Sequence, residues 1–395
     1  MSDTTLDRIL KQCHSFVANP DSNYMDDIFA QKLKAFSNPA FSSEDQKKLC
    51  TYHHKLILTE VIPAYQELAD SLESLRGTGK SSRGLAFFEG GREYYLYLLQ
   101  SQTGTYVPVG QIEKRLSAQL LSDYREISSL LEQNSSLIDR LNQCSGELTL
   151  TPTQMLEKLP ELMKKDFPEL KDATYELRTV HPSMKKFLSP AFYLTPPVDT
   201  RTPNVIYIND SGRTSSLELF GTLAHEGFPG HLYQTVSFAE NNPSDIRYLV
   251  TSSGYVEGWA TYVESYGYEY AASLMNDPDS AKNAVRFAWL NRSMNLCIYS
   301  LIDIGIHYRG WDAARTAVFL KAFGINNAST AAEIYQYIVE TPGNYLKYYW
   351  GYLNFLDLKT VCQKRLGDDF DLKEFHRRIL DIGPVQFPVL EKYMK

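Results

Sequence analysis

Two histidines and two glutamates in the second half of the sequence have the types and spacing of a hydrolytic metal site. Residues 225–231 read HEGFPGH, and Glu257 follows in the segment VEGWA. Imidazole nitrogens and carboxylate oxygens are common ligands of Zn²⁺, and hydrolytic zinc sites also need a carboxylate close to the metal. These residues predict a zinc site suited to hydrolysis, with His225, His231 and a glutamate as ligands.

The two histidines must be brought together by a break in helical geometry. Ser215 and Glu218 have the pattern of a capping box, so we expect a helix from about Ser216 with His225 near its end. In a regular helix, residues six apart point about 120° away from each other. Pro229 cannot donate to the carbonyl of His225, and a glycine follows it. We therefore expect residues 227–230 to form a widened turn that brings His231 to the side of His225.

Glu257 and Glu264 are the candidates for the carboxylates of a second helix. They lie seven apart and therefore nearly on one helix face. We expect Glu257 to bind the metal and Glu264 to orient a histidine, with Gly258 allowing the two helices to approach closely. The alternative is that a histidine at a helix end is structural and that a buried glutamate pairs with arginine. The joint pattern favours the metal site.

Length, charge and hydropathy exclude several classes of protein. The chain has 395 residues, a formal net charge of −7 and a pI near 5.7. Such a chain offers no broad basic surface, so we expect neither a nucleic-acid partner nor binding to an anionic membrane. No run of about 18 apolar residues occurs, so membrane insertion is not expected.

The cysteines and the first residues bear on the compartment. The five cysteines are an odd number and include no C-x-x-C pair, which predicts free thiols in a reducing compartment. The sequence starts MSDTTLDRILK, without the basic and then apolar profile of a secretion signal. We expect a cytoplasmic protein; the alternative is an exported protein whose signal has been removed from this sequence.

Helical periodicity dominates, and we expect a mostly α (α+β) fold of elongated form. A helix is predicted over 51–75, with Pro63 as a kink, and a long amphipathic helix over 111–141. Residues 175–180 and 204–208 are β-branched and aromatic, which predicts a small antiparallel sheet beside the His-Glu helix. We divide the chain into an N-terminal helical lobe, 1–145, and a catalytic helical lobe with the sheet, 146–395.

These motifs together resemble a known bacterial family, domain of unknown function 885 (DUF885). The resemblance is carried by HEGFPGH and EGWATYVE, and it continues through residues 303–311, 342–351 and 370–376. Upstream, residues 61–65, 90–95 and 193–197 also fit. The resemblance thus extends over most of the chain, and its central motifs are specific.

The resemblance implies a gluzincin-type zinc metallopeptidase, a mostly helical protein with a deep cleft crossed by the His-Glu helix and a Glu-bearing helix. It implies His225, His231 and Glu257 as ligands of Zn²⁺ and Glu226 as the general base. Many members are longer at the front and some look like exported lipoproteins, so the natural protein is expected to extend further at its N-terminus.

Further residues are candidates for binding the reacting groups. The resemblance points to Tyr348 as the donor to the developing oxyanion, with Tyr349 and Tyr352 as competitors. His307 is a second candidate, although Asp303 four residues earlier could simply pair with it. Any one of three arginines could bind a substrate carboxylate or form an ordinary surface ion pair: Arg286, Arg292 and Arg309.

Three functions remain open at this point. The first is a zinc peptidase acting on short peptides, because a helical scaffold suggests a deep cleft rather than an open groove. The second is a metal-dependent amidase acting on a non-peptide or cell-wall amide, which needs the same groups. The third is a non-catalytic metal-binding protein.

Overall fold

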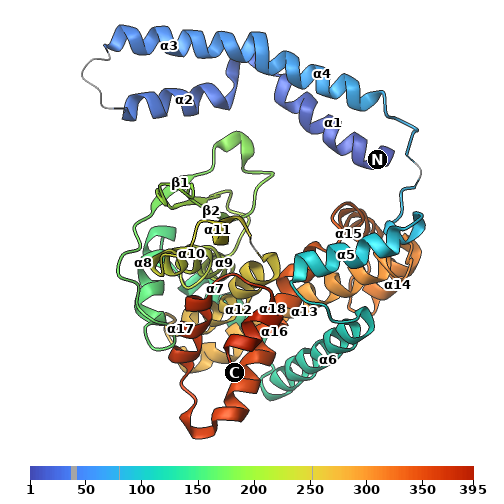
Figure 1. Ribbon diagram of the computed structural model, residues 1–395, viewed down its shortest axis with the longest axis vertical. Helices are drawn as coiled ribbons and strands as arrows, with labels where there is room; N and C mark the ends of the chain where they lie inside the picture. Colours follow the sequence, from blue (N-terminus) through green and yellow to red (C-terminus); the bar gives the residue numbers. More distant parts are fainter. Residues whose placement is uncertain (37–41, 80, 251) are drawn as a thin grey trace. The chain divides into compact units, whose positions relative to one another are not determined.

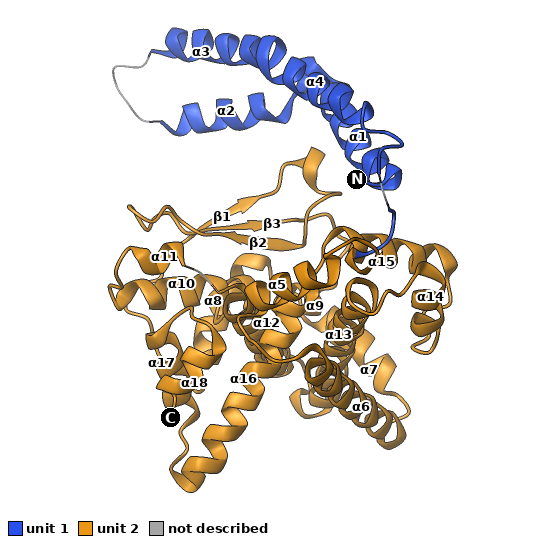
Figure 2. Ribbon diagram, turned by 45° about the vertical axis from the view of Figure 1, so that its right-hand side comes forward, with its two compact units in different colours: residues 1–84 blue, residues 85–395 orange. Residues whose placement is uncertain are grey.

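The computed structural model describes residues 1–36, 42–79, 81–250 and 252–395. The chain forms two compact units, Met1–Gly84 and Leu85–Lys395, coloured separately in Figure 2. This boundary lies upstream of the one expected at residue 145. Residues 85–145 pack inside the second unit because their apolar side chains, including Leu116 and Leu120, belong to its core.

The first unit is helical. Pro63 lacks an N–H and its ring crowds the carbonyl four residues earlier, and the helix widens into a π-helical turn just before it. The predicted interruption of the helix over 51–75 is therefore confirmed. The helices are α1 (Asp3–Val17), α2 (Tyr24–Ala35), α3 (Ser43–Leu56), the π-helical turn (Ile57–Val61) and α4 (Ile62–Glu73), with a 3₁₀ turn at Pro20–Ser22.

The second unit carries the remaining helices and the sheet (Figure 1). The single helix expected over 111–141 is interrupted at Asn134, whose side chain accepts hydrogen bonds from Ser136 and thereby ends one helix and begins the next. The helices are α5 (Gly91–Thr103), α6 (Val109–Gln133), α7 (Leu137–Glu147), α8 (Pro152–Met163), α9 (Ser216–Glu226), α10 (His231–Glu240), α11 (Ile246–Leu249), α12 (Ser253–Ala272), α13 (Pro278–His307), α14 (Ala313–Lys321), α15 (Ala328–Glu340), α16 (Asn344–Leu366), α17 (Leu372–Ile382) and α18 (Phe387–Tyr393), with 3₁₀ turns at Leu85–Phe87, Pro182–Met184 and Gly367–Asp369.

The sheet has three strands: β1 (Glu176–Thr179), β2 (Ala191–Leu194) and β3 (Val205–Ile208). Figure 2 shows β3 between the other two, parallel to β1 and antiparallel to β2. The predicted small sheet is present, with strands inside 175–180 and 204–208. The prediction that these two strands pair antiparallel is wrong, because the antiparallel neighbour of β3 is β2, which was missed. β1 can pair in parallel on the other edge because a long crossover separates it from β3.

Helix α12 is the centre of the second unit and is buried along most of its length. Gly258 faces Gly351 of α16, and a Cβ on Gly258 would lie 2.5 Å from the backbone of Gly351. Gly267 allows an equally close approach to α9, because a Cβ on it would lie 2.5 Å from the Cβ of Ala224. The close approach expected of Gly258 is therefore made to α16, and Gly267 makes the approach to the His-Glu helix.

Buried polar residues join α13 to the start of α16. Asp303 accepts hydrogen bonds from the Tyr95 hydroxyl (2.5 Å) and the N–H of Gly343 (2.9 Å). His307 accepts the N–H of Leu85 at Nδ1 (3.1 Å) and donates from Nε2 to the carbonyl of Ile338 (2.8 Å). No hydrogen bond or ion pair joins the side chains of Asp303 and His307 within the described residues, because each side chain finds its partners on other elements.

No helix in the described part of the chain combines the length and the apolar character needed to cross a bilayer.

We predict that Gly258→Ala destabilises the second unit, because the added methyl group must displace the backbone of α16. Overpacking of this kind typically costs about 1–3 kcal/mol. Thermal unfolding followed by tryptophan fluorescence reports on this unit alone, since all four tryptophans lie in it. Gly146→Ala in α7 is the control, because open space surrounds that position; equal Tm values for the two variants contradict the packing account.

We also predict that Asp303 makes stability depend on pH. Burial raises the pKa of Asp303 to about 7, above its ordinary value of 3.8. The folded state therefore holds a proton that the unfolded state releases, and stability falls as pH rises from about 4 to 7. Asp303→Asn should remove this loss, about 2–4 kcal/mol in urea unfolding. If the free energy of unfolding changes with pH in the same way in both proteins, Asp303 is ionised in the folded state over this pH range and the prediction is wrong.

Candidate metal centre

Helix α9 places His225 at its C-terminal end. The Ser215 hydroxyl accepts the N–H of Glu218, and the Glu218 carboxylate accepts the N–H of Ser215, which completes the capping box. Leu217, Phe220 and other apolar residues of α9 are buried. The predicted start at Ser216, and the place of His225 near the other end, are confirmed.

Residues 227–230 separate two helices. The prediction of a widened turn within one helix is wrong in this respect: α9 ends at Glu226 and α10 begins at His231. The backbone of Gly230 packs against the last turn of α9 so closely that a Cβ would lie 1.8 Å from the carbonyl oxygen of His225. Trp259 of α12 donates its indole N–H to the carbonyl of Pro229 (2.9 Å) and holds the connection.

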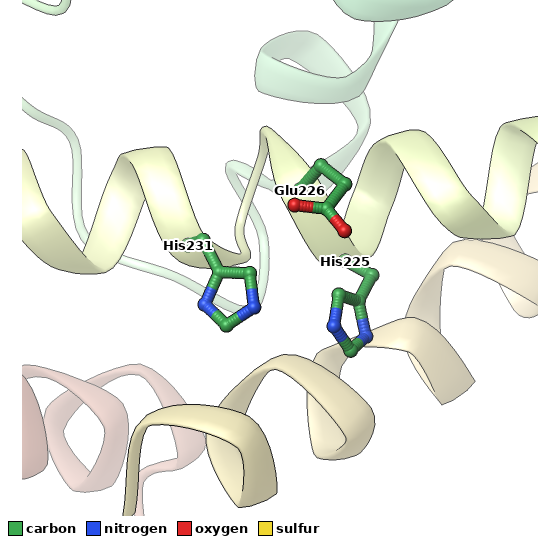
Figure 3. A group of neighbouring side chains, drawn as sticks. All are labelled: His225, Glu226 and His231. Atoms are coloured by element: carbon green, nitrogen blue, oxygen red, sulfur yellow. The ribbon is translucent and has the colours of Figure 1, made fainter. Parts of the chain in front are cut away.

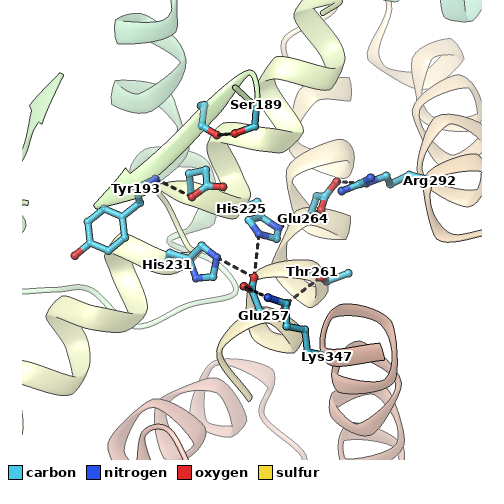
Figure 4. A network of polar contacts seen from close by, with 11 residues as sticks. Ser189, Tyr193, His225, His231, Glu257, Thr261, Glu264, Arg292 and Lys347 are labelled. Carbon is cyan, nitrogen blue, oxygen red and sulfur yellow. Dashed lines mark hydrogen bonds and ion pairs between the residues drawn. The ribbon is translucent and has the colours of Figure 1, made fainter. Parts of the chain in front are cut away.

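The break brings the two imidazoles together, as Figure 3 shows. The ring centroids of His225 and His231 are 4.8 Å apart, with the planes at 85°. Oε2 of Glu257 lies 3.3 Å from Nε2 of His231 and 3.8 Å from Nε2 of His225 (Figure 4). Zinc binds such atoms at about 2.0–2.2 Å, so two ligands of a tetrahedral site lie about 3.3–3.5 Å apart. The shorter of these two separations matches that of two ligands on one metal ion, and the longer slightly exceeds it.

Glu264 holds His225 from its other side. Nδ1 of His225 donates to Oε2 of Glu264 (3.2 Å), and Nε of Arg292 donates to Oε1 (3.0 Å). Burial opposes the charge of Glu264, but Arg292 and His225 together lower its pKa. A carboxylate in this position fixes the imidazole so that Nε2 points to a metal. The contact expected of Glu264 is present.

Two carboxylates compete for the place of third ligand. His225, Glu226 and His231 form a group that could hold a metal ion, with ligand atoms within 4.8 Å of one another. Glu257 has one oxygen in contact with both imidazoles, whereas Oε2 of Glu226 accepts the N–H of Tyr193 in β2 (2.9 Å). These contacts favour Glu257 over Glu226 as the third ligand beside the two imidazoles.

The charges of this group are coupled. Burial disfavours the charged form of His225, but hydrogen bonds with Glu257 and Glu264 outweigh it and raise its pKa to about 10. Burial likewise opposes ionisation of Glu257, yet His225 and His231 hold its pKa well below the usual range. Glu257 is therefore an ionised carboxylate between two imidazoles, and a metal ion bound here would displace the proton that His225 holds at this raised pKa.

A cavity of about 300 Å³ opens beside the group and is lined by His225, Glu226 and Tyr348 among others. The Tyr348 ring lies 6.3 Å from that of His225, and burial followed by the charge of Glu257 raises the pKa of its hydroxyl. Tyr349 instead shares a hydrogen bond with Ser293 (2.8 Å), and Tyr352 packs against Trp289. Of the three candidate tyrosines, Tyr348 lies at the cavity.

Two predicted residues lie apart from these histidines and glutamates, and two other residues that contact the glutamates were missed. No contact of the described chain joins His307 or Asp303 to the imidazoles of the group. Lys347, with Nζ 3.6 Å from Oε1 of Glu257, was missed although it adjoins Tyr348 in sequence. The backbone N–H of Tyr193 carries no sequence signal of its own and could be found only by predicting β2.

Comparison with known proteins identifies a family and a fold. The crystal structure of a proposed lipoprotein from Colwellia psychrerythraea superposes with a TM-score of 0.84 at 22% identity, covering 100% of this chain and 70% of that one. A proposed lipoprotein of unknown function from Shewanella oneidensis gives 0.62 at 16% identity, covering 92% and 69%. No curated protein matches the sequence. Residues 1–394 match the profile of the bacterial proteins of unknown function DUF885, and the chain therefore belongs to the DUF885 family.

Proposed function

We propose that this protein is a zinc-dependent hydrolase that cleaves amide bonds of short peptides. The observation that supports this best is the position of the Glu257 carboxylate, with one oxygen 3.3 Å and 3.8 Å from two imidazole nitrogens. Burying a carboxylate is costly unless charged partners or a metal compensate, and these spacings suit zinc.

His225, His231 and Glu257 would hold the zinc ion. When bound, zinc polarises the carbonyl to be cleaved and lowers the pKa of water. Glu264 keeps the Nδ1–H of His225 engaged, so that only Nε2 is presented to the cation.

Glu226 is the proposed general base. It lines the cavity, and the N–H of Tyr193 holds one carboxylate oxygen, which leaves the other free to accept a proton. Water adds its oxygen to the carbonyl carbon while Glu226 takes its proton, and Glu226 then delivers that proton to the amine nitrogen as the C–N bond breaks.

Tyr348 is the proposed donor to the carbonyl oxygen as negative charge develops there. Tyr348 lines the cavity, and the raised pKa of its hydroxyl keeps it protonated at neutral pH. A donor placed before the reaction stabilises the charge without rearrangement. His307 is not assigned this role, since both of its nitrogens are engaged by backbone groups.

The compartment bears on the substrate. The five cysteines are free, as expected in a reducing compartment. The likeness in fold to two proposed lipoproteins supports the alternative of an exported protein. Export would favour the second candidate function, an amidase acting on a cell-wall amide with the same residues.

We predict that Glu226→Gln keeps zinc and loses turnover, whereas Glu257→Gln loses zinc. Removing a general base typically lowers the rate about 10²–10⁴-fold. Elemental analysis after zinc loading and dialysis gives the metal content, and mass spectrometry of a short-peptide library gives the activity.

Glu269→Gln is the matched control for this pair, because Glu269 is an exposed residue of the same helix as Glu257. It should keep both zinc and turnover. Parental turnover by Glu226→Gln refutes the proposed base, and full zinc content in Glu257→Gln refutes the ligand.

We further predict that Tyr348→Phe lowers kcat about 10²–10³-fold with little change in KM, because the lost hydrogen bond forms only as charge develops. Steady-state kinetics on the best library peptide measures both constants. Tyr352→Phe should behave like the parent. An equal loss of kcat in the two variants means that neither hydroxyl acts on the substrate.

A further inference from the structure

Two cavities meet at Arg292. The cavity lined by His225, Glu226 and Tyr348 shares part of its wall with a larger cavity of about 640 Å³. We call this larger one the outer cavity. The shared wall consists of Pro190, Thr222, Glu264 and Arg292. Among the described residues that line either cavity, Arg292 is also the one lysine or arginine. An anion in either cavity would therefore have this guanidinium in the wall around it.

The guanidinium of Arg292 is only partly engaged. Its Nε donates to Glu264, and within the described residues its two terminal nitrogens have no hydrogen-bond partner. The side chain is 45% exposed. Arg286 and Arg309 each use two nitrogens on one carboxylate, Glu126 and Glu113 respectively. Of the three arginines that the sequence left open, Arg292 retains a free pair of donors.

Arg292 lies close to His225, the first of the proposed metal ligands. The single carboxylate of Glu264 separates it from His225, with contacts of 3.0 Å and 3.2 Å. One amino-acid residue spans about 3.3–3.6 Å, and a carboxylate bound by a guanidinium adds a hydrogen bond of about 2.8 Å. The separation therefore suits one or two residues between a bond at the metal group and a terminal carboxylate at Arg292.

The rest of the outer cavity offers neutral hydrogen-bonding groups. Asn142 of α7 and both Asn291 and Asn295 of α13 line it, and their side-chain amides have no partner within the described chain. Amides of this kind can bind the polar groups of a peptide on both the donor and the acceptor side. The acidic Glu218 is already engaged in the cap of α9.

We propose that Arg292 binds the C-terminal carboxylate of a short peptide, whose leaving portion occupies the outer cavity while its scissile bond lies at His225, Glu226 and His231. This inference rests on the proposed function and narrows it to cleavage near a free C-terminus. The free edge of the guanidinium provides two parallel N–H groups, which match a carboxylate in a bidentate pair.

The test compares the tripeptide Ala-Ala-Ala with its C-terminal amide. Binding is measured by calorimetry to the Glu226→Gln protein, which does not consume the peptide, both zinc-loaded and zinc-free. The free acid should bind about 10–100-fold more tightly than the amide, as expected for hydrogen bonds to a charged group. Adding Arg292→Gln should remove this difference, and adding Arg286→Gln on the same helix should leave it intact.

The outcomes separate this inference from the proposed function. Equal binding of acid and amide overturns the inference even where the parent hydrolyses peptides, and a preference that survives Arg292→Gln overturns the assignment to Arg292. A preference that depends on Arg292 in a protein without hydrolysis supports the binding of the carboxylate by Arg292 and refutes the proposed function. The zinc-free measurement excludes an effect of Arg292 on the metal through Glu264 and His225.

Discussion

The contact of one Glu257 oxygen with two imidazoles is the constraint on which the rest of the site depends. Its three participants come from α9, α10 and α12, so the carboxylate stays in place only if three helix axes are fixed. Glycines make this closeness possible: Gly267 lets α12 approach α9, and Gly258 lets it approach α16. Small residues at the helix contacts thus set the separation of charged groups at the site.

The surroundings of His225 divide into two sides with different tasks. On one side Glu264 and Arg292 form a chain of charged hydrogen bonds that fixes the ring. On the other side Glu226 and Tyr348 line the cavity, where a substrate could reach them. Because Arg292 ends that chain and also lines both cavities, the same residue can orient the metal ligand and bind a substrate anion.

Local signals in the sequence predicted much of this site. The capping box at Ser215 predicted the start of α9, and the spacing of Glu257 and Glu264 predicted that both lie on nearly the same helix face. What escaped prediction depends on distant contacts. The break at residues 227–230 was predicted, but its full separation of α9 from α10 was not, and Trp259 of α12 holds it. The pairing of β2 with β3 follows from tertiary packing rather than from the composition of four residues. The unit boundary at Gly84 likewise depends on where α5 and α6 find their apolar partners.

X-ray absorption spectroscopy of the zinc-loaded protein tests the central claim most directly. The account predicts a four-coordinate shell of nitrogen and oxygen at about 2.0–2.2 Å with the multiple-scattering pattern of two imidazoles, and loss of one imidazole in His231→Ala. A shell without histidine scattering, or one unchanged by His231→Ala, would contradict it.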